Sequence, residues 1–470
     1  MLVLKCCQSR VLVRRMITAQ LCWKKMHHVL FCALVLLVCL TVFSERRTKF
    51  AEKDGDGEDV KYVAENPYIG ERNEQIDTVR YPKLNDIEDE KGEQEDVDVV
   101  YTWVNGSDPA FIKDFQMMMK MQNKAKPEVL ALNRYNDWGT LKYSMRSVEK
   151  NAPWIRHIYL LTNGQVPDWL DLNSPRISIV THADIFTNKS DLPAFTSPAI
   201  ESHIHRIQGL SNRFLYMNDD IILPTKVYMS DFYTERDGYK LRFIEERLEH
   251  CNKVCASNSV NNGICEANCT SPSCEFDGDD CKGIANIPLY MGSDKEFMYD
   301  SWGGSLRHTH FLLNKMFGPK DRYIPEHAAH MFDKDVLSKL VESFPDEWNR
   351  TSSTKIRHHL TIQPEFAYYN YLKELEELRT NNVRTTTIWT HKNAEKIDFS
   401  MDNRGVIGRK LQFKWCKREI LLKRPKFLVF SDHFTRPVYS NEKEEIQEAL
   451  TKFLRSLFPV PSQFEKKQTL

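Results

Sequence analysis

The sequence lacks an excess of charge of either sign, internal repeats and a second long apolar run. Its 65 Lys and Arg residues balance 65 Asp and Glu residues over 470 positions, so a basic nucleic-acid-binding protein is not expected and no nucleic-acid partner is predicted. A single long apolar run excludes a polytopic membrane protein. With 41% hydrophobic and 28% charged residues, the chain is not wholly disordered and should form globular domains.

The N-terminal region divides into three segments by charge and hydropathy. Residues 1–28 carry six Lys and Arg residues and no acid, residues 29–43 form an uncharged apolar run, and residues 44–95 are rich in acid. The basic flank predicts a cytoplasmic tail and an uncleaved signal anchor, with the rest of the chain in a secretory lumen. Because the run has only fifteen residues, fewer than the roughly 17–25 of most spanning helices, a cleaved signal peptide and a buried helix are the alternatives. The acidic segment should be a solvated stem.

Beyond the stem, apolar runs that predict strands alternate with segments of helical periodicity. Strands are predicted at residues 97–104, 155–161, 177–180 and 214–217. Helices are predicted at residues 141–148, 198–210, 305–317, 336–344, 366–375 and 442–458, and residues 379–410 have no clear assignment. The alternation predicts an α/β fold with a Rossmann-like, mostly parallel sheet flanked by helices. A small cysteine-rich module at 251–283 should interrupt a catalytic domain whose two parts are 96–250 and 284–376, and a C-terminal region follows at 377–470.

Asn218, Asp219 and Asp220 directly follow the last of these predicted strands. Ligands of open α/β sheets bind beyond the carboxyl ends of the strands, and adjacent carboxylates there can hold a divalent cation that bridges nucleotide phosphates. Asp219 and Asp220 are therefore candidate metal ligands, and Asn218 is a candidate nucleotide contact. A turn with solvated acids is the alternative, which the apolar residues on both sides disfavour.

A second candidate site lies at the end of the first predicted strand, where Tyr101, Trp103, Asn105 and Gly106 occur close together. An aromatic ring can stack on a nucleotide base, and glycine lets backbone amides approach a phosphate. These four residues are therefore candidate nucleotide-binding residues. An ordinary strand-to-turn junction fits the local sequence equally well, and Asn105-Gly106-Ser107 is also a glycosylation sequon.

Histidines form two local groups that could act in metal binding or proton transfer. His203 and His205 are two positions apart and do not share a helix face, which disfavours zinc. His327 and His330 are three apart on a predicted short helix, which is compatible with zinc, but no third ligand is evident nearby. His327 is more economically a general base, and Arg357 could clamp a phosphate with its planar guanidinium. A structural role is the alternative for each.

Six of the twelve cysteines lie within residues 251–281, a density that is unusual for a cytosolic enzyme. Disulfides would stabilise so small a module, and six cysteines allow about fifteen pairings. Asn262, Asp277 and Asp280 offer the hard oxygen ligands that Ca²⁺ prefers, which disfavours zinc. Cys416 is left as an odd luminal cysteine, either buried and free or bridging the two chains of a homodimer.

Five segments closely resemble the Stealth family, and the cysteine module resembles a Notch-type repeat. The segments are Asp98–Asp108, Leu141–Ser147, Ala152–Ile158, Pro198–Arg206 and Phe214–Asp220. The resemblance to the repeat adds the carbonyl of Val260 to the calcium ligands. It also implies the disulfide pairs Cys251–Cys274, Cys255–Cys269 and Cys265–Cys281.

The Stealth resemblance implies transfer of a sugar-1-phosphate from a nucleotide sugar to a sugar hydroxyl, with Mg²⁺ or Mn²⁺ required. The members of the family that this chain resembles imply UDP-GlcNAc as the donor, mannose on high-mannose N-glycans of lysosomal enzymes as the acceptor, and UMP as the second product. The resemblance also implies catalytic roles for Asp219, His327 and Arg357, and a Golgi membrane protein of the single-pass type II class with a luminal catalytic domain. Two other functions remain open. One is a metal-dependent glycosyltransferase that would release UDP, and the other is a non-catalytic, calcium-binding luminal receptor.

Overall fold

A computed structural model of the chain describes residues 95–121, 135–248, 301–380, 382–401, 406–432 and 440–467. All of them fall in one compact unit, Lys91–Leu470. The predicted anchor, the stem and the cysteine module lie outside the described residues, and so do the candidate calcium ligands Val260, Asn262, Asp277 and Asp280. Within the described part of the chain, no helix has the length and apolar character needed to cross a membrane.

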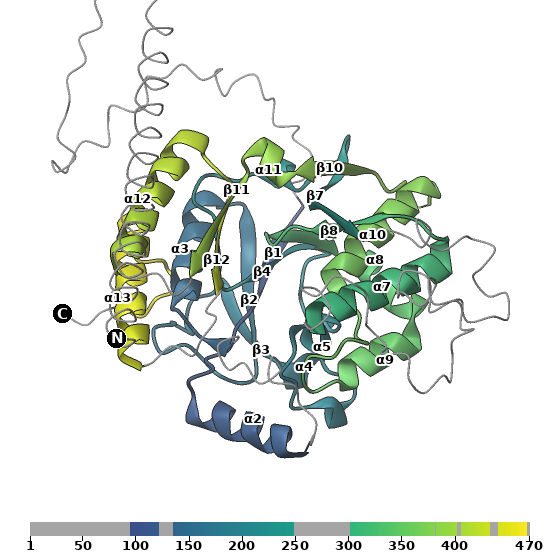
Figure 1. Ribbon diagram of the computed structural model, residues 1–470, viewed down its shortest axis with the longest axis horizontal. Coiled ribbons are helices and arrows are strands. Elements are labelled where there is room, and N and C mark those ends of the chain that lie inside the picture. Colours follow the sequence, from purple (N-terminus) through teal and green to yellow (C-terminus); the bar gives the residue numbers. More distant parts are fainter. Residues whose placement is uncertain are drawn as a thin grey trace, which may run out of the picture. The chain divides into compact units, whose positions relative to one another are not determined.

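A five-stranded central sheet organises the unit, with the strand order β3-β2-β1-β4-β9 (Figure 1). Its strands are β1 (Val97–Thr102), β2 (Ile155–Thr162), β3 (Ile177–Thr181), β4 (Arg213–Asn218) and β9 (His330–Asp333). The first four are parallel, whereas β9 runs antiparallel to β4. Most residues of β1 and β4 are buried, as expected for strands that are covered on both faces. The predicted mostly parallel α/β sheet is confirmed, and the four predicted strands correspond to β1–β4.

Two smaller sheets join the C-terminal region to the rest of the unit. One has the order β10-β7-β6, with β8 also paired to β7, and the other has the order β11-β12-β5. Their strands are β5 (Ile221–Ile222), β6 (Tyr233–Thr234), β7 (Gly238–Leu248), β8 (Arg322–Pro325), β10 (Thr385–Trp389), β11 (Lys396–Met401) and β12 (Phe427–Asp432). β12 pairs antiparallel with β5, which directly follows Asp219 and Asp220. The C-terminal region therefore frames the candidate carboxylates.

Helices cover the sheets from both sides, with α3, α12 and α13 on one side and α7–α10 on the other (Figure 1). The α-helices are α2 (Pro109–Met121), α3 (Thr140–Asn151), α4 (His182–Ile185), α5 (Ser197–Glu201), α7 (Ser301–Phe317), α8 (Lys334–Ser343), α9 (Pro345–Ser353), α10 (Pro364–Glu377), α11 (Thr390–Asn393), α12 (Val406–Lys423) and α13 (Ser440–Leu457). Among the described residues, short 3-10 turns occur at η5 (Lys189–Asp191), η6 (Ile204–Arg206) and η7 (Met229–Asp231). The helices predicted around α3, α7, α8, α10 and α13 are confirmed.

Two predicted helices are wrong. The helix expected at residues 198–210 ends at Glu201, and only the short η6 follows it. Its continuation is broken because the ring of His203 turns into the interior, where it hydrogen-bonds to Ser352 of α9. The short helix expected around His327 and His330 is instead the connection from β8 to β9, because His330 pairs with Tyr216 in the central sheet.

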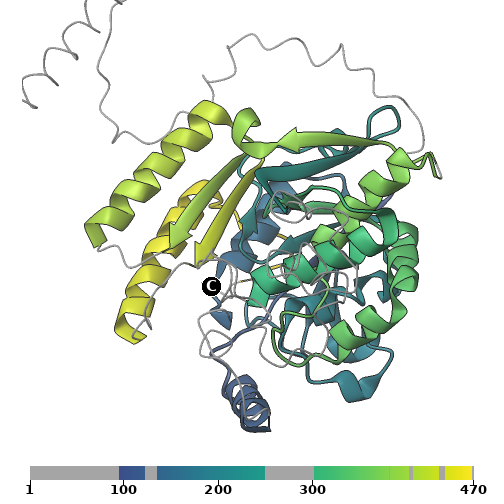
Figure 2. The ribbon, with the colours of Figure 1, turned by 45° about the vertical axis from the view of Figure 1, so that its right-hand side comes forward.

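The C-terminal helices α12 and α13 pack beside β11 and β12 (Figure 2). Their shared core contains Phe399, Phe430, Phe453 and Cys416. Cys416 is free among the described residues and fully buried, in agreement with the first of its two predicted alternatives. Burial raises the pKa of the Cys416 thiol to about 12, which keeps it protonated and unreactive near neutral pH.

Candidate functional site

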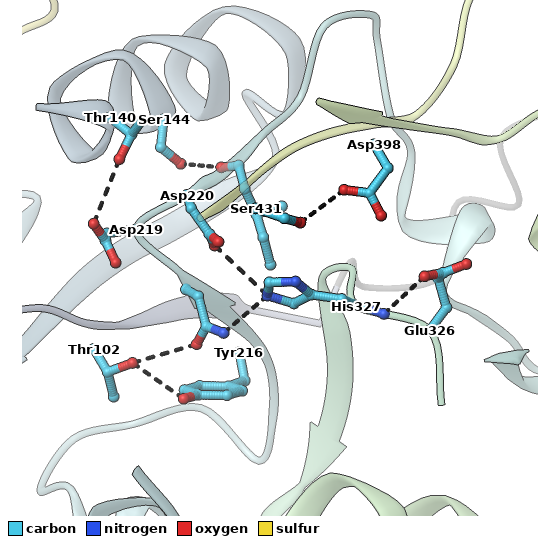
Figure 3. Close-up of polar contacts among 12 residues, drawn as sticks. Thr102, Thr140, Ser144, Tyr216, Asp219, Asp220, Glu326, His327, Asp398 and Ser431 are labelled. Atoms are coloured by element: carbon cyan, nitrogen blue, oxygen red, sulfur yellow. Dashed lines mark hydrogen bonds and ion pairs between the residues drawn. The ribbon is translucent and has the colours of Figure 1, made fainter. Parts of the chain in front are cut away.

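The candidate site begins where the carboxyl ends of β1 and β4 meet. The two strands are in register from Asp98 to Thr102, and this register places Thr102 beside Asn218. Asp219 and Asp220 form the turn from β4 into β5, and α3 supports that turn. Thr140 of α3 donates a hydrogen bond to Asp219 Oδ2 over 3.4 Å, and Ser144 donates one to the carbonyl of Ile221 (Figure 3). The carboxylate pair thus lies at the sheet edge that the sequence predicted.

The two carboxylates are held where their negative charge is poorly solvated. Burial, together with repulsion from Asp220 and Asp137, raises the pKa of Asp219 well above its usual value. Burial also raises the pKa of Asp220, an effect that His327 partly offsets. Asp220 Oδ1 is buried and has no hydrogen-bond partner among the described residues. Such an unsatisfied oxygen beside a second carboxylate fits a divalent cation, which would neutralise both charges.

A cation at this place would depend on the two aspartates rather than on a larger protein cage. The described residues contain no group of three or more His, Cys, Asp or Glu side chains arranged to hold a metal ion. Mg²⁺ commonly binds through one or two carboxylates and completes its shell with water and substrate phosphates. The residues present therefore fit a cation that binds together with a phosphorylated ligand.

His327 lies directly opposite the carboxylates, in the connection between β8 and β9. Its Nε2 atom accepts a hydrogen bond from Asn218 Nδ2 at 3.1 Å and is 3.6 Å from Asp220 Oδ1 (Figure 3). Its backbone amide donates to Glu326 Oε1 over 3.0 Å. Glu326 is in turn held by Thr390 and by Lys396, at 2.6 and 2.7 Å. Glu326 thus holds the backbone of His327 and Asn218 holds the ring at Nε2, while the side chain is 39% exposed to incoming ligands.

Asp398 and Lys396 of β11 are site residues that the sequence analysis missed. Lys396 Nζ lies 3.0 Å from Asp398 Oδ2, and Ser431 donates to Asp398 Oδ1 over 2.7 Å (Figure 3). Burial alone would raise the pKa of Asp398, but Lys396, Ser431 and His327 together lower it. The sequence analysis gave residues 379–410 no assignment. The alternation of Ile397, Phe399 and Met401, which are buried, with polar residues is the pattern that could have predicted this strand.

Arg357 lies beside two acidic side chains, Glu201 and Glu365. Burial raises the pKa of Glu201, and a hydrogen bond from Tyr216 and the charge of Arg357 oppose that rise. Burial and repulsion from Glu201 raise the pKa of Glu365 to about 8, although the charge of Arg357 opposes this rise as well. The charge of Asp220 also raises the pKa of Glu365. Arg357, Glu201 and Glu365 are therefore close enough to the two aspartates to interact with them electrostatically. The sequence analysis had assigned no role to Glu201 or Glu365.

The residues predicted to bind a nucleotide are only partly accessible. Tyr101 has no exposed surface and its hydroxyl hydrogen-bonds to Ser144 at 2.7 Å, which is inconsistent with the predicted stacking on a base. Trp103 is also buried. Asn105 and Gly106 are half-buried, and the Gly106 amide donates to the Tyr135 carbonyl over 2.9 Å. A Cβ on Gly106 would lie 2.2 Å from that oxygen, so packing against Tyr135 already requires glycine.

Within the residues that the structure describes, His203, His205 and His330 belong to no group of three or more side chains that could hold a metal ion. His330 is buried, and its Nδ1 atom hydrogen-bonds to Tyr369 at 2.8 Å. His203 is bound to Ser352 and Arg206. Burial lowers the pKa of each of His203, His205 and His330 to about 3. These three side chains therefore stay neutral and structural, whereas His327 faces the carboxylates.

Family models match the segments that build this site. Conserved regions 1, 2, 3 and 4 of the Stealth proteins match residues 95–117, 134–241, 326–374 and 418–470, in that order along the chain. The chain belongs to the Stealth family. Stealth region 1 supplies Thr102, region 2 supplies Asp219 and Asp220, and region 3 supplies His327 and Arg357. An LNR domain of the Notch type matches residues 248–282, where the sequence predicted the cysteine module.

Several Stealth relatives are phosphotransferases by name. The N-acetylglucosamine-1-phosphotransferase subunits alpha/beta of Homo sapiens are 46% identical over 164 residues, which is 35% of this chain and 13% of that protein. An exopolysaccharide phosphotransferase of Streptomyces coelicolor is 29% identical over 79% of this chain and 53% of that protein. The chain thus spans well under two thirds of either relative. Among solved structures, a galactosyltransferase in complex with donor and acceptor sugar analogues is 10% identical to this chain. The structural match covers 78% of this chain and 98% of the galactosyltransferase, with a TM-score of 0.32.

Proposed function

We propose that this Stealth protein transfers GlcNAc-1-phosphate from UDP-GlcNAc to a mannose hydroxyl of high-mannose N-glycans on glycoproteins. UMP is the second product. On lysosomal enzymes this would be the first step of marking of the mannose 6-phosphate type. The observation that carries the proposal is the half-buried Asp219–Asp220 pair at the end of β4, facing His327 from a separate Stealth region. The names of the phosphotransferase relatives support this reaction over other uses of such a site.

The proposed reaction forms one oxygen–phosphorus bond and breaks another. The mannose hydroxyl oxygen bonds to the phosphorus that carries the sugar, the bond from that phosphorus to the bridging oxygen breaks, and UMP leaves with that oxygen. His327 Nε2 takes the hydroxyl proton, and because this nitrogen has a single lone pair, it must exchange the hydrogen bond from Asn218 for one from the hydroxyl. Asp219 and Asp220 would hold Mg²⁺ or Mn²⁺, which supplies charge neutralisation for the diphosphate. Arg357 would bind the developing phosphate charge.

The cellular setting belongs to the same proposal. The basic flank and apolar run at residues 1–43 support a single-pass type II protein of the Golgi membrane, with the Stealth regions in the lumen. The match of the LNR domain supports a structural Ca²⁺ in the cysteine module. A disulfide-bonded, calcium-stabilised module suits an oxidising, calcium-containing lumen.

Product analysis tests the proposal directly. The purified full chain is incubated with UDP-GlcNAc, Mg²⁺ or Mn²⁺ and α-methyl mannoside, and both nucleotide and sugar products are measured by mass spectrometry. UMP together with a GlcNAc-phospho-mannoside diester supports the proposal. UDP together with a GlcNAc-mannoside would identify a glycosyltransferase, and binding of Ca²⁺ without any turnover would favour a luminal receptor. The double variant Asp219→Asn, Asp220→Asn is the control, because it keeps side-chain size and removes both charges.

A further inference from the structure

A network of charged side chains joins the connection that carries His327 to the C-terminal region. The His327 amide donates to Glu326 Oε1 over 3.0 Å (Figure 3). The same oxygen accepts from Lys396 Nζ of β11 at 2.7 Å, and Glu326 Oε2 accepts from Thr390 Oγ1 of α11 at 2.6 Å. Lys396 Nζ also donates to Asp398 Oδ2 over 3.0 Å. The backbone of His327 is therefore linked through Glu326 to α11 and β11.

The donors and acceptors of this network match when both carboxyls are ionised and Lys396 is charged. The His327 amide and the Lys396 ammonium can only donate, and the Glu326 carboxylate can only accept. Asp398 is held from β12 as well, because Ser431 donates to its Oδ1 atom over 2.7 Å. The side chains of Lys396 and Glu326 are only 8% and 13% exposed. Solvent and salt therefore screen the Glu326–Lys396 ion pair much less than they screen a surface pair.

The proposed reaction makes a firm hold on the backbone of His327 important. His327 Nε2 has to exchange its hydrogen bond from Asn218 for one from the acceptor hydroxyl. During that exchange the ring loses its hydrogen bond to β4, so its place depends on the backbone to which it is attached. Glu326 is held at both ends, since its amide donates to the Arg242 carbonyl over 2.9 Å and its carboxylate binds Lys396. A misplacement of about 1 Å at a reacting group can cost about 100-fold in rate.

We propose that Glu326 and Lys396 are positioning residues, whose ion pair fixes the backbone of His327 while its ring changes partner from Asn218 to the acceptor hydroxyl. The inference rests on the proposed function, in which His327 is the base. Lys396 lies between the matched Stealth regions 3 and 4, residues 326–374 and 418–470, so the family match gives it no role. Through β11, the C-terminal region thus supports the base as well as framing the carboxylates.

Kinetics of variants at Lys396 provide the first test. Lys396→Met keeps most of the side-chain length without the charge, and it should lower kcat about 10-fold, as expected for the loss of one hydrogen bond to a charged group. KM for UDP-GlcNAc should not change, because the donor binds at the aspartates. Lys396→Arg can still donate to both carboxylates and should retain most of the activity. Full activity of Lys396→Met, or no rescue by Lys396→Arg, would overturn the proposal.

A double variant separates positioning from stability. Lys396→Met alone leaves the Glu326 carboxylate shielded from water without its cation, which should lower the melting temperature. Glu326→Gln combined with Lys396→Met removes both charges and should recover much of that loss. Its kcat should nevertheless stay as low as that of Lys396→Met, because the link from His327 to β11 is still absent. Recovery of kcat together with the melting temperature would mean that the ion pair acts only through stability, and would overturn the proposal.

Lys426→Met is a matched control for the loss of an ion pair made by the C-terminal region. Lys426 Nζ lies 3.0 Å from Asp231 Oδ2 and donates to the Lys226 carbonyl over 3.2 Å. Lys426 directly precedes Phe427, which pairs with Lys396 in the register of β11 and β12. The two lysines thus start from the same end of this sheet and bind different partners. Lys426→Met should lower the melting temperature with kcat unchanged, and an equal loss of kcat in Lys396→Met and Lys426→Met would contradict a specific role for Lys396.

The charge of Lys396 also acts on Asp220, whose pKa it lowers. An effect through the proposed metal site is therefore measured separately, by titrating Mg²⁺ in the assay. The Mg²⁺ concentration that gives half the maximal rate should be the same in Lys396→Met as in the wild type. Restoration of kcat by high Mg²⁺ would mean that Lys396 acts through Asp220, and would overturn the proposal.

Hydrogen exchange at the His327 amide tests the proposal without any turnover. Mass spectrometry of overlapping peptides from the full chain isolates the exchange of this amide, which donates to Glu326 Oε1. Lys396→Met should speed it about fivefold or more, because the accepting carboxylate is no longer held in place, whereas Lys426→Met should leave it unchanged. Unchanged exchange in Lys396→Met would overturn the proposal. If the wild type releases no UMP, the proposed function fails, and the exchange still decides whether the ion pair holds the backbone of His327.

Discussion

The ring of His203 gives the fold a calculable sensitivity to acid. The side chain is 4% exposed, and its Nδ1 atom accepts a hydrogen bond from Arg206 Nη1 over 2.7 Å, since a guanidinium can only donate. Nε2 must therefore carry the ring proton, which it donates to Ser352 Oγ over 2.9 Å, and Ser352 donates to Asp191. A second proton on Nδ1 would oppose the Arg206 donor. Burial, reinforced by the charge of Arg206, lowers the pKa of His203 to about 3.

The direction and size of the effect follow from the two end states. An unfolded histidine has a pKa of about 6.5, so the unfolded chain takes up a proton at His203 that the native chain excludes. The stability that neutral His203 contributes is fully present above pH 6.5 and is lost as the pH falls from 6.5 toward 3. At pH 5 the difference from 6.5 is about 1.5 pH units, which corresponds to about 2 kcal/mol. A typical domain has a stability of only about 5–15 kcal/mol.

Urea unfolding followed by tryptophan fluorescence, at pH 7.5 and pH 5.0, measures this effect. His203→Gln can accept from Arg206 and donate to Ser352 but does not titrate, so between the two pH values it should lose about 2 kcal/mol less stability than the wild type. Ser352→Ala is the matched control, because it removes a hydrogen bond of the same chain at both pH values and leaves His203 facing Arg206. Its pH dependence should equal that of the wild type. Parallel pH dependences for the wild type and His203→Gln would refute the reasoning.

The remaining predictions concern the proposed reaction and the cysteine module. Asp219→Ala and Asp220→Ala should each lower UMP release by about 100-fold or more while the protein still folds, and normal release by both would exclude this metal site. His327→Ala should abolish transfer to the acceptor yet leave UDP-GlcNAc binding by calorimetry intact; preserved turnover with only a lower melting temperature would end its role as the base. Arg357→Lys should also be poor, since an ammonium cannot replace a two-pronged guanidinium on phosphate, and a fully active variant would contradict this. Asp277→Ala should lower the yield of folded protein more than turnover per folded molecule, because the predicted Ca²⁺ would stabilise the module, and free thiols in the module of the purified protein would contradict its predicted disulfides.

Parts of the site could be read from local sequence alone. The apolar run of β4 ends at Asn218, and the acids that follow it must lie at the carboxyl edge of the sheet whichever strand is its neighbour. The final helix, α13, was evident from apolar residues that recur every three or four positions. Exposure along the central strands could not be read in this way. Because both faces of β1 are covered, Tyr101 is buried despite its place near a strand end.

Contacts between segments far apart in the sequence determined the other features of the site. The β4–β9 pairing brings the connection that carries His327 to the carboxylates, over a separation of more than 100 residues. The same packing broke the predicted helix after Glu201, where the His203–Ser352 bond outweighs helical propensity. Local patterns thus determined the strands β1–β4, the helices α3, α7, α8, α10 and α13, and where the two aspartates lie. Only the tertiary structure decided which side chains face them, because hydrogen bonds and charges between remote segments leave no periodic signal in a sequence.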